Sequence, residues 1–164
     1  MKTIIKFSTI ALLFLSSVAQ ANVYSNLPDC KNRRGDVLDG SIEEIHAIMN
    51  SRQQKPMIYV TGVVEKILPE DHIGLPHQLY IMTLAAGKNT VKFRVVSNLD
   101  FGRVPLQIGQ KMSVCGEYKK IKEGNLLHWT HFDPRGNHPD GFTIYNDVLY
   151  GDQETSNRQE RQNF

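Results

Sequence analysis

The chain has 164 residues, and its 19 lysines and arginines against 17 aspartates and glutamates give a formal net charge of +2 at pH 7. Two of the 19, Lys2 and Lys6, lie in the first 21 residues, which contain no acid, so the remainder is formally neutral with 17 basic and 17 acidic residues. A protein that binds nucleic acid non-specifically carries a clear basic excess, so this balance argues against that class.

The first 21 residues have the pattern of a cleavable export signal. Lys2 and Lys6 form a positive start, residues 7–18 are mostly apolar, and the sequence AQA at 19–21 supplies a small-x-small cleavage pattern. The apolar run is shorter than the roughly 20 residues that a membrane-spanning helix needs. We therefore expect a mature chain that begins at Asn22, has no membrane span and is periplasmic or secreted.

Two cysteines follow the predicted signal, Cys30 and Cys115. In an oxidising compartment such a pair is more often bridged than free, which predicts a disulfide between them. The alternative is two unrelated thiols. Cys115 lies on a predicted strand, where a small buried apolar residue would also fit.

Residues 22–55 are predicted to form an extended, polar lead-in and one helix. The basic run at 31–34 is interpreted as a solvated segment. Ser41 and Glu44 form a capping box, and Pro56 ends any helical continuation. The apolar residues that share one face of this helix are Ile42, Ile45, Ile48 and Met49.

Residues 56–150 are predicted to form one β domain. The strand-like segments are 57–68, 77–85, 90–97, 110–122 and 126–132. Three strands in a meander and two in a later hairpin have the count and rhythm of a small five-stranded OB-like barrel. Gly62 indicates a bulge or a barrel bend, and residues 142–150 a short C-terminal hairpin. The fold class is thus mainly β, and the polar residues 151–164 are expected to be a disordered tail.

Residues 128–141 concentrate groups that can perform chemistry, including three of the six histidines. Imidazole and carboxylate are typical ligands of zinc and similar ions, and they also act as general acids and bases. The candidate ligands for a divalent metal are His128, His131, Asp133 and His138. In a regular strand His128 and His131 would point to opposite faces, so they converge only if the strand bulges or ends between them.

The same segment also fits two successive turns. Residues 133–136 (DPRG) and 138–141 (HPDG) both have proline second and glycine fourth, as type I turns favour. An ordered structural turn, a ligand-binding surface and a metal or catalytic site therefore all remain open. Trp129 is interpreted as a core residue or as a stacking platform.

The sequence HWTH at 128–131, followed by Asp-Pro, Gly136, His138, Gly141 and the aromatic Phe142, resembles the signature of a bacterial family named domain of unknown function 3465. Further matches to the family pattern before residue 128 extend the resemblance to about residues 57–150. It implies a small exported protein with no assigned activity. One departure is Ser97, where the family usually has histidine. The resemblance also implies one polar cluster, formed by His77, Gln78, Asn98, Asp100, Arg103, His128, His131, Asp133 and His138.

These observations favour a non-enzymatic, monomeric binding module for an oligosaccharide or an oligonucleotide. Its candidate binding residues are the polar cluster together with Trp129 and Arg135. The first alternative is a metal-assisted hydrolase, a nuclease or phosphoesterase, in which a divalent metal activates water and Arg135 or Arg103 meets a phosphate. The second is a structural or interaction protein of the cell envelope.

Overall fold

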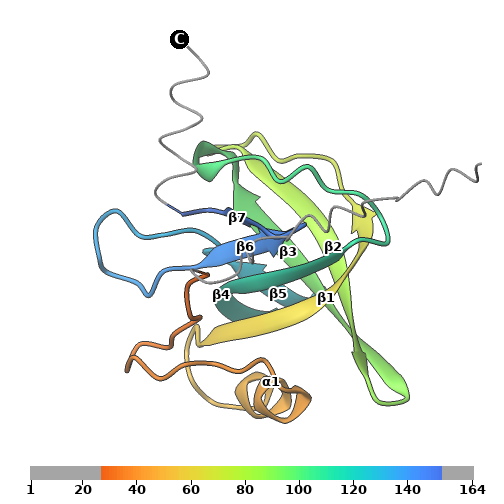
Figure 1. Cartoon of the computed structure of the whole chain (residues 1–164), viewed down its shortest axis with the longest axis vertical. Coiled ribbons are helices and arrows are strands. Elements are labelled where there is room, and N and C mark those ends of the chain that lie inside the picture. Colours follow the sequence, from red (N-terminus) through yellow and green to blue (C-terminus); the bar gives the residue numbers. More distant parts are fainter. Residues whose placement is uncertain (1–26, 153–164) are drawn as a thin grey trace, which may run out of the picture.

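The computed structural model describes residues 27–152, which form a mainly β protein with one helix (Figure 1). The predicted export signal, and the predicted tail beyond its first two residues, lie outside the described residues. Gly151, the first residue of that predicted tail, is buried, and its carbonyl accepts a hydrogen bond from the backbone N–H of Phe132 at 2.7 Å. The folded part therefore extends at least this far.

Five strands close into a barrel. They are β1 (Met57–Ile67), β2 (His77–Ala86), β3 (Asn89–Asn98), β4 (Lys111–Ile121) and β5 (Gly124–His128). Their order around the wall is β1-β2-β3-β5-β4, and pairing of β1 with β4 closes it. The pairing of β3 with β5 is parallel, and the other pairs are antiparallel. This arrangement confirms the predicted five-stranded OB-like barrel.

A short hairpin extends the sheet from β4. It is formed by β6 (Phe142–Tyr145), which pairs with β4, and β7 (Val148–Tyr150). This is the C-terminal hairpin that the sequence predicts.

The first strand is shared by two neighbours, and it bends where it passes from one to the other. Residues 57–63 pair with β4, whereas residues 63–67 pair with β2. A Cβ atom on Gly62 would lie 2.5 Å from the carbonyl oxygen of Thr83, so only glycine fits there. A few residues later, the pairing of β1 with β2 has a register irregularity between Val64 and Lys66. The bend predicted at Gly62 is thus confirmed.

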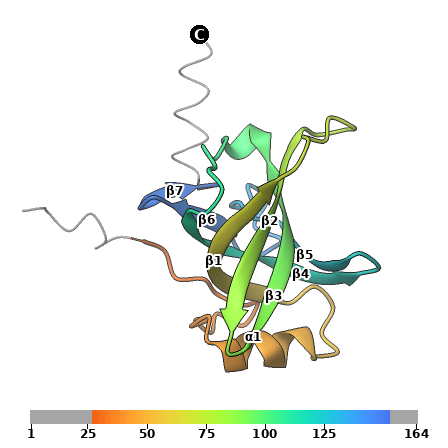
Figure 2. The ribbon, with the colours of Figure 1, turned by 90° about the vertical axis from the view of Figure 1, so that its right-hand side faces the viewer.

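Helix α1 (Ile42–Met49) covers one end of the barrel (Figure 2). Its Ile45 is fully buried in the barrel core. The predicted capping box is present in modified form. The Ser41 Oγ accepts the N–H of Glu44 at 3.2 Å, but the Glu44 carboxylate accepts the N–H of Gly40, at 2.9 Å, instead of the N–H of Ser41.

The lead-in is packed against the outside of the barrel. A disulfide joins Cys30 to Cys115 on β4, with 5.6 Å between the Cα atoms, and confirms the predicted pairing. Both cysteines belong to a small apolar cluster outside the barrel wall, together with Leu38, Met57 and Phe142. The disulfide therefore holds the lead-in on the outer face of β4.

The fifth strand ends earlier than the sequence predicts, at His128 instead of residue 132. Trp129 has φ +56°, a left-handed conformation that breaks the strand.

The first predicted turn, at residues 133–136, is confirmed, because the Gly136 N–H donates to the Asp133 carbonyl at 3.1 Å. The second is wrong: the Gly141 N–H donates to the carbonyl of His131, at 2.9 Å, so residues 138–141 close back on the start of the loop.

Candidate functional site

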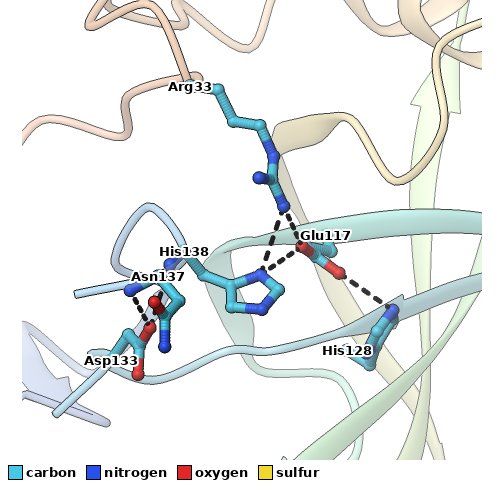
Figure 3. A network of polar contacts seen from close by, with 6 residues as sticks. All are labelled: Arg33, Glu117, His128, Asp133, Asn137 and His138. Carbon is cyan, nitrogen blue, oxygen red and sulfur yellow. Dashed lines mark hydrogen bonds and ion pairs between the residues drawn. The ribbon is translucent and has the colours of Figure 1, made fainter. Parts of the chain in front are cut away.

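The centre of the candidate site is a buried carboxylate, Glu117 on β4, whose side chain is 1% exposed. Its Oε1 lies 2.8 Å from Nδ1 of His138 and 3.4 Å from Nη2 of Arg33. Its Oε2 lies 3.4 Å from Nε2 of His128. Figure 3 shows the arginine and His138 converging on one carboxylate oxygen while His128 approaches the other.

Three of these groups are positioned by the barrel and the lead-in. Glu117 and His128 are directly paired across β4 and β5, so their side chains lie on the same face of the sheet. Glu117 also lies two residues after Cys115 and shares its outward face. The disulfide to Cys30 brings the nearby Arg33 over this face.

His138 is positioned by the loop between β5 and β6, which Asp133 organises. The Asp133 carboxylate accepts the backbone N–H groups of Arg135 at 3.0 Å, Asn137 at 2.6 Å and His138 at 2.9 Å. These bonds, the largest being that from Arg135, hold the pKa of the Asp133 carboxyl below its usual value. Asp133 is therefore a structural anchor of the loop that presents His138.

Aromatic rings support the imidazoles of this loop. Trp129 lies against His138 with 4.2 Å between ring centroids and against His131 with 4.9 Å. His131 is stacked on Phe101 at 3.9 Å with an interplanar angle of 8°. Trp129 thus contacts both His131 and His138, and of these two histidines only His138 contacts the buried carboxylate.

Several polar atoms of this cluster are buried without a hydrogen bond within residues 27–152: Glu117 Oε2, His128 Nε2 and Trp129 Nε1. Burial lowers the pKa of His128, because desolvation disfavours the imidazolium, although the Glu117 charge opposes the shift. Burial likewise lowers the pKa of His131. A buried carboxylate surrounded by ionisable groups is expensive to desolvate, and such clusters are enriched at functional sites.

An open groove of about 980 Å³ adjoins this cluster. One wall is formed by the lead-in and the other by the loop between β5 and β6, which lie on the same side of the barrel in Figure 1. Both Arg33 and His138 line it. The other charged or amide side chains in the lining are Asp29, Lys31, Asn32, Asn137, Asp140 and Asp152, and the larger apolar ones are Leu27, Pro28, Phe132, Pro139 and Phe142.

The structure divides the site residues predicted from the sequence into two groups. His128, Trp129, His131 and His138 lie in one connected cluster, with Asp133 and Arg135 in the loop that supports it. The second group organises the chain around the connector that follows β3: its members are His77, Gln78, Asn98, Asp100 and Arg103. The single polar cluster that the resemblance implies is therefore not formed by direct contacts between the two groups.

The second group has structural contacts. The Gln78 side chain exchanges two hydrogen bonds with the backbone of Val104, at 2.9 and 3.1 Å. Asn98 caps the 3-10 helix Leu99–Phe101 by accepting the N–H of Asp100 at 2.9 Å. Arg103 forms an ion pair with Glu70, which raises its pKa. These residues brace loops, and none of them lines the groove beside His138.

The four predicted metal ligands do not converge on one point. His128 and His138 contact opposite oxygens of Glu117, His131 is stacked on Phe101, and the Asp133 carboxylate accepts three backbone N–H groups. Within residues 27–152, no group of three or more histidine, cysteine, aspartate or glutamate side chains is placed to hold a metal ion. The metal site expected from residue types alone is not supported by this geometry.

No curated protein matches the chain. A family model does match, over residues 37–151, which cover most of the chain and the whole barrel. The chain therefore belongs to the family described as protein of unknown function DUF3465.

Proposed function

We propose that this protein is an exported binding module whose groove binds an oligosaccharide. The observation that supports the proposal best is the groove between the lead-in and the loop of His138, whose walls combine carboxylates, amides, cations and apolar surface. Sugar hydroxyl groups both donate and accept hydrogen bonds, so they are matched by such a mixed lining. OB-like barrels commonly bind oligosaccharides or oligonucleotides.

The charges of the groove favour the oligosaccharide over the oligonucleotide. Its lining includes three aspartates, Asp29, Asp140 and Asp152, against two permanent cations, Lys31 and Arg33. A nucleic acid needs basic side chains at its phosphates, and carboxylates along the same groove would repel them. A neutral sugar polymer meets no such penalty.

Export is supported by the disulfide. A bridge between Cys30 and Cys115 is typical of proteins that fold in an oxidising compartment such as the periplasm. Together with the signal pattern of the sequence, it supports a periplasmic or secreted binding protein. No helix among residues 27–152 is long and apolar enough to cross a membrane.

The proposed groove differs from the usual binding face of an OB-fold, which lies over strands 2 and 3 and the adjacent loops. This difference makes the proposal testable by position. We would titrate the ¹⁵N-labelled protein with neutral oligosaccharides of several linkages and map the perturbed amides. Shifts at Asn32, Asn137 and His138 support the groove, whereas shifts confined to β2 and β3 support the usual OB face instead.

Two exposed side chains of the groove allow a matched mutational test. Lys31→Ser and Asn137→Ser change opposite walls without touching Glu117, and each should weaken binding two- to tenfold, equivalent to about 0.4–1.4 kcal/mol. Lys88→Ser, in the exposed turn between β2 and β3, is the control and should leave binding unchanged. Equal affinities for all three variants would refute the groove as the binding site.

A further inference from the structure

We infer that His138, held by Glu117, is a general base in the groove and hydrolyses O-acetyl esters on the bound oligosaccharide. The inference rests on the proposed function, because it names the reaction performed on the ligand of that same groove. It is carried by a buried carboxylate–imidazole pair that opens onto the groove beside an arginine.

The pair fixes which nitrogen of His138 is available. A carboxylate only accepts hydrogen bonds, so at 2.8 Å from Glu117 Oε1 the Nδ1 atom carries the proton. The lone pair is then on Nε2, the ring nitrogen that is not bonded to Glu117. Arg33 Nη2, 3.3 Å from Nδ1, is a donor as well, so its partner is the Glu117 oxygen at 3.4 Å.

The imidazole is also held in place before any ligand arrives. Its ring lies 4.2 Å from that of Trp129, and its backbone N–H donates to Asp133 at 2.9 Å. Restricting a catalytic group to one orientation removes an entropic cost from the reaction step. A histidine whose tautomer and ring plane are both fixed is the arrangement that general bases require.

A purely structural role explains the pair less well. Burying a carboxylate costs several kcal/mol, and the Oε2 of Glu117 is left without a hydrogen bond among the described residues. A neutral side chain could attach the loop to β4 without that cost. The charge of Glu117 has a clear use, however, if His138 becomes an imidazolium during a reaction, because the carboxylate stabilises that cation.

The reaction consumes one water molecule and involves no oxidation. His138 Nε2 takes a proton from water as the water oxygen bonds to the acetyl carbon, and the negative charge that develops on the acetyl oxygen is stabilised by the Arg33 guanidinium, which lines the same groove. The bond between the acetyl carbon and the sugar oxygen then breaks. Nε2–H returns its proton to that oxygen, which leaves a free sugar hydroxyl and acetic acid.

Other hydrolyses fit the groove less well. Glycoside hydrolysis uses two carboxyl groups that flank the scissile bond. The carboxylate that contacts the His138 ring, Glu117, is buried and engaged by three basic groups, and the neighbouring Asp133 carboxylate accepts three backbone N–H groups. Phosphodiester substrates would meet the aspartates of the groove. An acetyl ester is neutral and needs only one base and one stabiliser of negative charge.

The test is release of acetate from O-acetylated xylo-oligosaccharides, followed by ¹H NMR with purified protein in the presence of EDTA. We expect release by the unaltered protein and a loss of at least about 100-fold in kcat for His138→Gln, with little change in KM. Glu117→Gln is a positioning variant: it keeps an oxygen that accepts the Nδ1–H but lacks the charge, so kcat should fall and its pH profile should change. His46→Gln, on the exposed side of α1, is the control and should match the unaltered protein.

Two results would overturn the inference: no acetate release from oligosaccharides that bind, or full release by His138→Gln with unaltered circular dichroism. Binding of the deacetylated oligosaccharide is measured in parallel. Binding without release leaves the proposed function in place and removes only the esterase. Absence of binding to either form removes both.

Discussion

Reducing the disulfide between Cys30 and Cys115 should destabilise the protein substantially. The two residues are 85 positions apart, so the bridge closes a loop that spans most of the barrel. In the chain-entropy model, opening a loop of this length costs about 4.5 kcal/mol at 25 °C. Natural domains have free energies of unfolding of about 5–15 kcal/mol, so this loss is a large part of the total.

The measurement is urea unfolding with and without a phosphine reductant, followed by circular dichroism and by the fluorescence of Trp129, the single tryptophan. We expect the free energy of unfolding to fall by about 3–5 kcal/mol on reduction, and the cooperative transition to move to lower urea. A Cys30→Ala/Cys115→Ala double variant should be insensitive to the reductant. A fall below about 1 kcal/mol would refute the reasoning, because the lead-in would then be held to β4 by its other contacts.

Two further predictions concern the barrel and the loop. Gly62→Ala should lower the free energy of unfolding by about 1–3 kcal/mol in urea titrations, because the new Cβ would lie 2.5 Å from the Thr83 carbonyl oxygen. The control is Gly87→Ala, where there is open space but a positive φ, and it should lower the free energy of unfolding by about 1 kcal/mol. A loss at Gly62 smaller than the loss at Gly87 would contradict the bend. Acid should destabilise the protein from about pH 6.5 downward, because the lowered pKa values of His128 and His131 make the unfolded chain bind protons that the folded one resists. His131→Gln should make the free energy of unfolding depend less on pH between 7 and 5, and an unchanged slope would contradict this assignment.

The barrel could be predicted because its signals are local. Alternating apolar residues mark each strand, and the capping box at Ser41 marks the start of the helix. Gly62 was recognisable as a glycine inside a long strand, where it indicates a bend. The structure shows why glycine is needed there: the backbone of Thr83 lies too close for a side chain. The disulfide could be predicted because the sequence has only two cysteines and a predicted export signal.

The end of β5 could not be predicted, because it depends on the backbone of one residue. Tryptophan is common in strands, and nothing in the residue type indicates the left-handed conformation of Trp129. That conformation ends the strand and begins the loop, in which His131 and His138 both contact the indole ring of Trp129. The metal hypothesis did not anticipate these ring contacts.

The two residues that complete the site, Glu117 and Arg33, were missed for a different reason. An acid in a strand and a basic run in a polar lead-in both suggest solvated side chains. The burial of Glu117 and its contact with Arg33 both depend on tertiary structure. A signal was nevertheless available. Glu117 shares a strand face with Cys115, and Arg33 lies three residues after Cys30, so the predicted disulfide already implied that the two were close.

Whether the groove beside Glu117 and His138 binds a sugar polymer is decided by the ¹⁵N NMR titration with neutral oligosaccharides. Asn32, Asn137 and His138 line the groove, and the Trp129 indole N–H reports on the ring that contacts His138. We expect saturable shifts at these groups, and weaker binding for Asn137→Ser than for Lys88→Ser. Shifts only over β2 and β3, or none with any oligosaccharide at millimolar concentration, would show that the groove is not the binding site.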